Sequence, residues 1–285
     1  MTDSALAPVL SPARRRSQPP PASVRLAMLW LLAMAACAVF ADLIRPYPIT
    51  QMSLGVRLAP PGTPGHWLGT DELGRDVLSR LIQSMRVSLV IAVGATFLSA
   101  FFGTALGFLA ARFRGIFEHI VVMLADFQAA LPFLIMALAV LAFFGSSMPL
   151  LIGLMGFYGW ERYARITRAL AISASAQGYA AAVVQLGATP SRVYLRHILP
   201  NVASTLIVSM TLTFPEIILL ESGLSFLGLG VQPPDASLGN MVGFGREYLT
   251  TAPWIMLAPA AVIILTTLAI SLFGDWLRDR LDPTL

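Results

Sequence analysis

The sequence has few charged residues, no lysine and a single cysteine, Cys37. Charged residues make up only 12% of its 285 residues, whereas a soluble domain carries about 25%. Hydrophobic residues reach 56%, so a folded chain could not cover its surface with groups that water solvates. Soluble globular, disordered and nucleic-acid-binding classes are therefore excluded, and the lone cysteine excludes an intrachain disulfide. A polytopic protein embedded in a lipid bilayer is the class that remains.

Long uncharged runs divide the chain into membrane-spanning helices, each of which needs about 20 apolar residues. The runs are continuous rather than alternating, which predicts an all-α fold and excludes a transmembrane barrel. A turn signal at Gly145-Ser146-Ser147-Met148-Pro149 divides the longest run into two spans. The sequence thus predicts six spans, at residues 23–42, 87–111, 117–143, 148–166, 197–226 and 248–274.

The arginines predict the orientation of these spans, since short cytoplasmic loops carry the excess of positive charge. With the N-terminus in the cytoplasm, thirteen of the nineteen arginines fall on the cytoplasmic side. We therefore expect both termini inside, with residues 1–22 as a disordered tail and residues 276–285 as a C-terminal tail. The stretch Met34-Ala35-Ala36-Cys37 is similar to the end of a lipoprotein signal, but five more spans follow, which favours a first span that is not cleaved.

Between the first two spans lies a long outer segment, residues 43–85, which is rich in proline and therefore begins extended. Apolar residues after Asp76 share one helical face, and this pattern predicts an amphipathic helix at the external membrane interface. Asp76 and Arg80 have the i,i+4 spacing of an ion pair. An alternative is a metal site, although the spacing matches no standard metal-binding loop; its ligands would be Asp71, Glu72 and Asp76.

The loop between the fourth and fifth spans, residues 167–198, is long for a helical bundle. Small and apolar side chains predict a short helix that ends at Gly187. Thr189-Pro190 then predicts the start of a second helix, which reaches Pro200. A surface of small apolar side chains permits the close approach of a partner, but the same hairpin could pack beneath its own bundle. The residues alone leave both interpretations open.

The same loop carries a family resemblance. Gly187, nine residues, His197, one residue and Leu199-Pro200 resemble the "EAA loop" of ABC importer permeases. That consensus reads Glu-Ala-Ala, three residues, Gly, nine residues, Ile, one residue and Leu-Pro. Here the Glu-Ala-Ala positions are taken by Ala181, Ala182 and Val183.

Three further motifs occur in the same order as in one class of these permeases. They resemble segments of the dipeptide and oligopeptide permeases before the second helix, after the fifth helix and at the C-terminus; here they are residues 69–76, 224–234 and 274–283. The chain is thus identified as a C-type permease subunit of the peptide/nickel class of ABC importers. The resemblance implies the transmembrane domain of a type I importer, with a five-helix core at residues 86–275.

The resemblance also implies partners in a bacterial inner membrane. They are a second homologous permease, two ATP-binding subunits and a periplasmic or lipid-anchored substrate-binding protein. ATP and Mg²⁺ would be used by the ATP-binding subunits, so this chain would bind no cofactor and would not be an enzyme. ATP-driven closure of those subunits would move the spans between inward-open and outward-open states.

The loop at residues 167–198, called the coupling loop below, would dock in a groove of an ATPase. The resemblance therefore assigns coupling roles to Ala181, Ala182, Gly187, Arg192, His197 and Pro200. The family's loop glutamate is replaced by Ala181, so docking would depend more on shape and apolar burial, or on Arg192 and Arg196.

Three acidic residues in or near the spans are candidates for the translocation pathway: Asp126, Glu216 and Glu221. A charge at membrane depth faces protein or water, so each could meet the ammonium group of a substrate. The alternative is pairing with a neighbouring helix or with the sister permease. Pro215, directly before Glu216, predicts a kink. Gly103 and Gly107 have the small-xxx-small spacing that predicts close helix packing.

No nucleophile–base pair, ATP-binding lysine loop or metal-ligand cluster can be assembled from the sequence, which disfavours a membrane-embedded hydrolase. Import of peptides is the expected function. A nickel chelate, glutathione or a peptide antibiotic are alternative substrates within the same family. A different class is a stand-alone ion-coupled carrier that titrates Asp126 and Glu216. Such carriers usually contain inverted repeats, and none is visible here.

Overall fold

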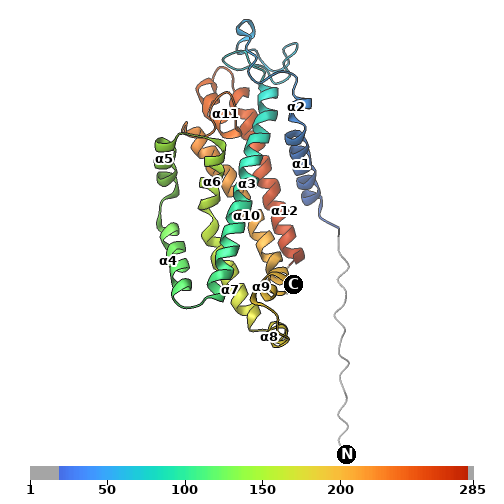
Figure 1. The fold of residues 1–285 in the computed structure, drawn as a ribbon. Coiled ribbons are helices and arrows are strands. Elements are labelled where there is room, and N and C mark those ends of the chain that lie inside the picture. Colours follow the sequence, from blue (N-terminus) through green and yellow to red (C-terminus); the bar gives the residue numbers. More distant parts are fainter. Residues whose placement is uncertain (1–18, 282–285) are drawn as a thin grey trace, which may run out of the picture.

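The computed structural model describes residues 19–281, apart from the side chains of Ala180, Ala181 and Val184, and this part of the chain is helical without a β-strand. The helices are α1 (Ala22–Val39), α2 (Ala41–Ile44), α3 (Val77–Arg112), α4 (Ile116–Ala130), α5 (Phe133–Phe144), α6 (Met148–Tyr158), α7 (Trp160–Ser175), α8 (Gly178–Gln185), α9 (Pro190–Arg192), α10 (Leu199–Phe226), α11 (Leu238–Gly245) and α12 (Trp254–Leu281). Short 3-10 turns lie at Leu54–Val56 and Arg246–Tyr248, and a π-helical turn at Val193–Ile198. The long helices lie along one axis, with the outer segment at one end and α8 at the other (Figure 1).

Four continuous helical runs are long and apolar enough to cross a membrane: Ala22–Val39, Val77–Arg112, Pro190–Phe226 and Trp254–Leu281. The pair α4 and α5 can count as a fifth span, although it is bent by 87°. The predicted span at 148–166 is divided at Gly159 into α6, of 11 residues, and the start of α7. The all-α polytopic fold is confirmed, whereas the count of six spans stays a prediction.

The predicted interfacial helix is the beginning of α3 rather than a separate element, because α3 runs for 36 residues from Val77. Asp76 caps its N-terminus and accepts a hydrogen bond of 2.7 Å from the backbone N–H of Ser79. The carboxylate also lies 3.0 Å from His66 Nδ1. The predicted ion pair between Asp76 and Arg80 is therefore wrong: Arg80 pairs with Asp71 at 2.6 Å.

The Asp71 carboxylate accepts several hydrogen bonds within the outer segment. It accepts hydrogen bonds of 2.9 Å from the backbone N–H groups of Leu73 and Arg75, and a 2.7 Å bond from Arg75 Nε. Among the described residues, no group of three His, Cys, Asp or Glu side chains could hold a metal ion. The acidic residues of this segment are used to cap α3 and to close turns, which contradicts the metal-site alternative.

The buried apolar side chains form an outer cluster and two inner clusters. The outer cluster joins α5, α6, α11, part of α12 and the outer parts of α3 and α10. The inner clusters join α4, α7 and the inner parts of α3 and α10. Two interruptions coincide with the boundary, Leu131-Pro132 between α4 and α5 and Gly159 between α6 and α7, whereas α10 runs through Pro215 as one helix. The bundle therefore consists of two packed halves: α3 and α10 run through both, and the other helices are broken between them or confined to one half.

Close packing of α3 on α7 depends on Gly103 and Gly107. A Cβ atom at Gly103 would collide with the carbonyl oxygen of Trp160. At Gly107 it would lie 2.6 Å from the carbonyl oxygen of Ala164. Since real Cβ atoms do not approach so closely, only glycine fits, and the predicted packing role of the two glycines is confirmed.

Candidate coupling loop and pathway residues

The coupling loop folds into two helical arms that meet at Gly187. The first arm is α8, and Gly187 ends it with a φ of +81°, a conformation that L-residues with side chains rarely adopt. The second arm begins at Pro190 and continues through the π-helical turn into α10, as far as Phe226. Thr189 holds the predicted N-cap position, although its side chain makes no capping bond. This elbow lies at the end of the molecule farthest from the outer segment (Figure 1).

The predicted coupling residues mostly lie on the surface of this elbow. Ala182, Gly187, Arg192 and Pro200 are exposed, and His197 is half-buried. Ala181 belongs to α8, but its side chain lies outside the described part of the structure. The structure therefore brings the residues to one end of the bundle.

The sequence placed Leu186 in the apolar stretch of the first arm but did not single it out as a coupling residue, although it is the most exposed apolar side chain of the elbow, at 87%. Val183 and Ala188 pack against the inner core, so the hairpin does rest partly on its own bundle. Leu186 is not among the residues that pack against this cluster. An apolar residue directly before a helix-ending glycine was the available signal.

The second arm is anchored in the inner core. Val193 and Ile198 of the π-helical turn are buried, the latter completely. The ring of Tyr194 meets that of Phe108 on α3 edge to face, with 5.6 Å between the ring centroids. A displacement of the elbow would therefore be passed directly to α10 and to the inner part of α3.

Of the three acidic candidates, Glu221 is enclosed by the bundle, with 1% of its surface exposed. It accepts a 2.7 Å hydrogen bond from Ser225 Oγ and a 3.4 Å bond from Ser88 Oγ. Ser88 Oγ also accepts a 3.1 Å bond from the backbone N–H of Leu238. Glu221 thus joins α3, α10 and α11 in this conformation, and its assignment to the pathway stays a prediction.

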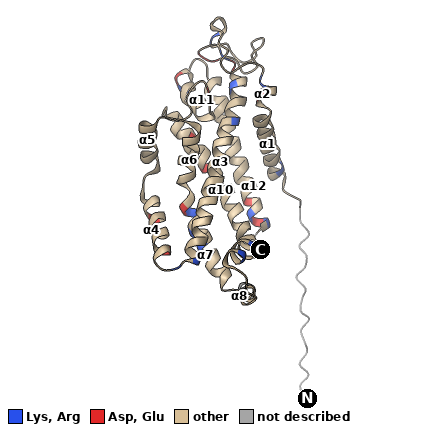
Figure 2. Cartoon of the chain, viewed as in Figure 1, with Lys and Arg blue, Asp and Glu red and all other residues tan. Residues whose placement is uncertain are grey.

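Glu216 and Asp126 lie nearer the surface, and each pairs with an arginine of α7. Glu216 Oε2 lies 3.0 Å from Arg162 Nη1, and Asp126 Oδ1 lies 3.6 Å from Arg165 Nη2. The charged residues of α4 and α7 lie in the lower part of the bundle as drawn in Figure 2. Sequence reasoning counted these arginines only as orientation signals. Their spacing at every third residue of one helix was the sign of a further role.

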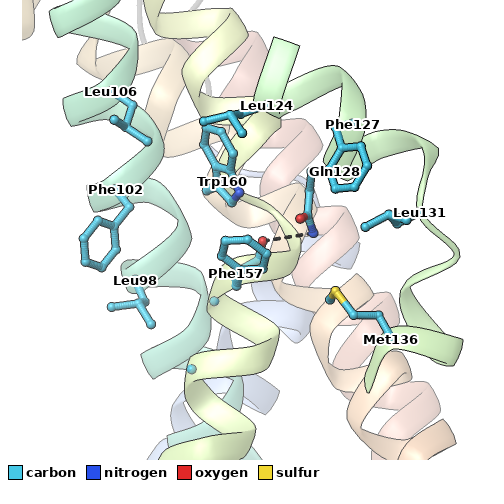
Figure 3. Close-up of a pocket in the computed structure, with 12 residues that line it drawn as sticks. Leu98, Phe102, Leu106, Leu124, Phe127, Gln128, Leu131, Met136, Phe157 and Trp160 are labelled. Atoms are coloured by element: carbon cyan, nitrogen blue, oxygen red, sulfur yellow. Dashed lines mark hydrogen bonds between the residues drawn. The ribbon is translucent and has the colours of Figure 1, made fainter. Parts of the chain in front are cut away.

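An apolar cavity of about 690 Å³ lies between α3, α6 and the bent pair α4 and α5 (Figure 3). Aromatic and aliphatic side chains line most of it, including Phe102, Phe127 and Phe157. Gln128 is the one amide among them, and its Nε2 donates a 3.4 Å hydrogen bond to the carbonyl oxygen of Phe157. A cavity with this lining accommodates apolar groups better than the charged ends of a peptide.

Comparison with known proteins identifies the family to which the chain belongs. The family model described as "Binding-protein-dependent transport system inner membrane component" matches residues 103–285. The chain is 38% identical to the di/tripeptide transport system permease protein DppC of Pseudomonas aeruginosa, over 90% of this chain and 87% of that protein. It is 34% identical to the oligopeptide transport system permease protein OppC of Mycobacterium bovis, over 90% and 88%. The glutathione transport system permease protein GsiD of Pectobacterium atrosepticum is also 34% identical, over 90% and 85%. The chain therefore belongs to the family of binding-protein-dependent transport system inner membrane components, as a multi-pass permease with the membrane domain of a type I ABC importer.

Proposed function

We propose that this permease forms half of a pathway that imports peptides across the bacterial inner membrane. Two of the similar proteins are named for di/tripeptide and oligopeptide transport, and the third for glutathione, which is itself a modified tripeptide. A short peptide backbone is the chemistry that these substrates share. The other half of the pathway is a second, homologous permease, and a substrate-binding protein delivers the peptide from outside.

The ATP-binding subunits dock on the coupling loop. The single observation that carries this proposal is the exposed apolar tip of the elbow, Leu186, on a hairpin whose second arm is continuous with α10. A groove on an ATPase would cover the tip, and the buried Ile198 would pass the movement into the inner core. Both termini then lie in the cytoplasm. ATP and Mg²⁺ act in the partner subunits, and this chain holds no cofactor of its own.

Along the pathway, Glu216 and Asp126 are our candidates for contact with the ammonium group of a peptide. Both carboxylates are partly open to solvent, at 42% and 65% exposure of the side chain. Glu221 would reach the pathway only after a rearrangement of α11, because its hydroxyl partners enclose it here. A stand-alone carrier is not favoured. Such a carrier would need a carboxylate that binds and releases a proton, whereas both Glu216 and Asp126 are paired with an arginine.

The test is uptake by the complete complex in proteoliposomes, with ATP on the side of the ATPases and the binding protein on the other. We expect a labelled tripeptide to accumulate only when ATP and binding protein are both present. Labelled glutathione, a labelled nickel chelate and a labelled peptide antibiotic are tested in the same assay. Accumulation of one of these with no uptake of any di-, tri- or oligopeptide would replace peptide with that substrate.

A further inference from the structure

The helix that leads into the coupling loop carries a row of ion pairs. Only two residues separate the end of α7 from the start of α8, so α7 leads directly into the elbow. Its arginines at every third position each reach an acidic residue on another helix: Arg162 with Glu216 at 3.0 Å, Arg165 with Asp126 at 3.6 Å, and Arg168 with Glu118 at 2.7 Å. Two of the three acidic partners belong to α4, so α7 is tied to α4 twice.

The strongest of these pairs is Arg168 with Glu118. Two nitrogens of the guanidinium, Nε and Nη2, both donate to Glu118 Oε1. The Glu118 side chain is 16% exposed, whereas that of Asp126 is 65% exposed. Charge-assisted bonds to a guanidinium gain strength when solvent is partly excluded, and exposed pairs gain little. Arg165 Nη2 also donates a 3.2 Å hydrogen bond to the carbonyl oxygen of Ala125 on α4. Of the two ion pairs between α7 and α4, the one at Glu118 is therefore the stronger.

The apolar attachments of α4 belong to the inner half of the bundle. Its buried apolar residues, Val121 and Ala125, contact a small cluster formed with α3 and α7. After the 87° bend at Leu131-Pro132, the buried residues of α5 belong instead to the outer cluster. Proline offers no backbone N–H to continue a helix, so the two parts of the pair are not held in one line. α4 can follow α7 while α5 stays with the outer half.

We propose that the Arg168–Glu118 ion pair transmits the movement of the coupling loop from α7 to α4, with Leu131-Pro132 as the hinge. The inference rests on the proposed docking of the ATPases on the elbow. The second arm of the elbow continues into α10 as one helix, so α10 moves directly with the elbow. α4 is not joined to the elbow in this way. The pair makes α4 part of the moving inner half, and Glu118 and Arg168 are positioning residues for transport.

The test uses the complete complex in proteoliposomes with three variants: Glu118→Arg, Arg168→Glu and the double exchange. We expect each single variant to transport about 5- to 150-fold less peptide per ATP hydrolysed, the range of typical coupling free energies. The double exchange restores the pair with reversed charges and should recover most of the loss. If a charge-reversed chain fails to insert into the membrane, the neutral variants Glu118→Gln and Arg168→Gln are measured instead.

A matched control removes one carboxylate charge from another pair between helices. Asp42 pairs with Arg86 of α3 at 2.7 Å on the outer side of the bundle. Asp42→Asn should leave the transport ratio within about twofold of the parent, because exposed pairs contribute little.

A second readout separates transmission from simple packing. Spin labels at the exposed Met123 of α4 and Ile135 of α5, with Cys37 replaced by serine, report the bend across Leu131-Pro132. We expect the label distance to change on ATP binding in the parent and in the double exchange, but not in Glu118→Gln. A parent with normal transport and a Glu118→Gln variant that bends and transports equally would overturn this inference alone. If the ATPases still bind normally to a complex whose elbow has been disrupted, the proposed docking is overturned as well.

Discussion

At the scale of single residues, Gly103 and Gly107 decide how closely α3 and α7 approach. Each lies against a backbone carbonyl of α7 at a distance that leaves no room for a methyl group. The contact brings the arginine-bearing face of α7 close to α4, where its acidic partners lie. Loss of either glycine would thus disturb both packing and the ion pairs.

We predict that Gly103→Ala destabilises the protein by about 1–3 kcal/mol, because the added carbon must displace the Trp160 carbonyl or the Tyr163 side chain. Gly153 of α6 is the matched control, since a Cβ there meets nothing within 4 Å. Gly153→Ala should stabilise slightly, by about 0.5–1 kcal/mol, as alanine favours helix over glycine. Thermal unfolding of the detergent-purified complex measures both. Equal effects of the two substitutions would contradict the packing assigned to Gly103.

Two acidic residues of the inner half, Glu216 and Asp126, could be found from the sequence, whereas Glu118 and the arginine partners could not. A carboxylate within an apolar run is rare, and this alone draws attention to Glu216. Its partner Arg162 lies 54 residues away, on a helix whose approach depends on the glycines of α3. Pairing between helices is a property of tertiary packing, which spacing within one helix does not reveal.

At the scale of elements, the elbow between α8 and α9 depends on the conformation of Gly187. We predict that Gly187→Leu uncouples transport from ATP hydrolysis while the spans remain inserted. A left-handed conformation costs a residue with a side chain about 1–2 kcal/mol, so α8 would leave its present orientation. Peptide uptake and ATP hydrolysis are measured together in proteoliposomes. Gly178→Ala, at a position with free space and no positive φ, is the control and should stay coupled. Normal coupled uptake by Gly187→Leu would refute this role of the glycine.

The apolar tip of the same elbow gives a second prediction. Leu186→Ala should weaken binding of the ATPase by about tenfold or more, since burial of a leucine side chain is worth about 1.5–3 kcal/mol. The stability of the permease itself should not change, because the side chain is 87% exposed in the free chain. Retention of the ATPase on the immobilised permease under increasing detergent washes measures the loss. Leu43→Ala, a change at an 83% exposed leucine on the outer side, should retain it fully.

The hydrophobic runs of the sequence predicted the positions of the helices better than the positions of the interruptions between them. The elbow, its glycine and the long span beyond it follow the predicted pattern closely. The region 117–143 was predicted as one span, although Leu131-Pro132 breaks it by 87°. A proline disfavours helix in the residue before it, so the signal was present, but apolar composition concealed it. The helix predicted at the membrane interface continues into α3, because no residue after Asp76 interrupts it.

At the scale of the whole molecule, the division into inner and outer halves connects the coupling loop to the pathway. The breaks at Leu131-Pro132 and Gly159 lie between the clusters, and α3 and α10 each cross the boundary as one helix. The inner half carries the elbow and the ion pairs, and the outer half carries the capped outer segment and α11. Such an arrangement suits movement of one half relative to the other. Composition could not show it, because α3 and α10 run through both halves as continuous apolar helices.

The central claim is that this chain is one half of a channel that separate ATPases drive. The most direct measurement is purification of the tagged chain from its native membrane in mild detergent, with the co-purifying proteins identified and counted by mass spectrometry. The account predicts one second permease and two ATP-binding subunits for each copy of this chain, and weaker retention of the ATP-binding subunits when the elbow is disrupted. A chain recovered alone or with further copies of itself, and able to move solute in vesicles without ATP, would contradict it.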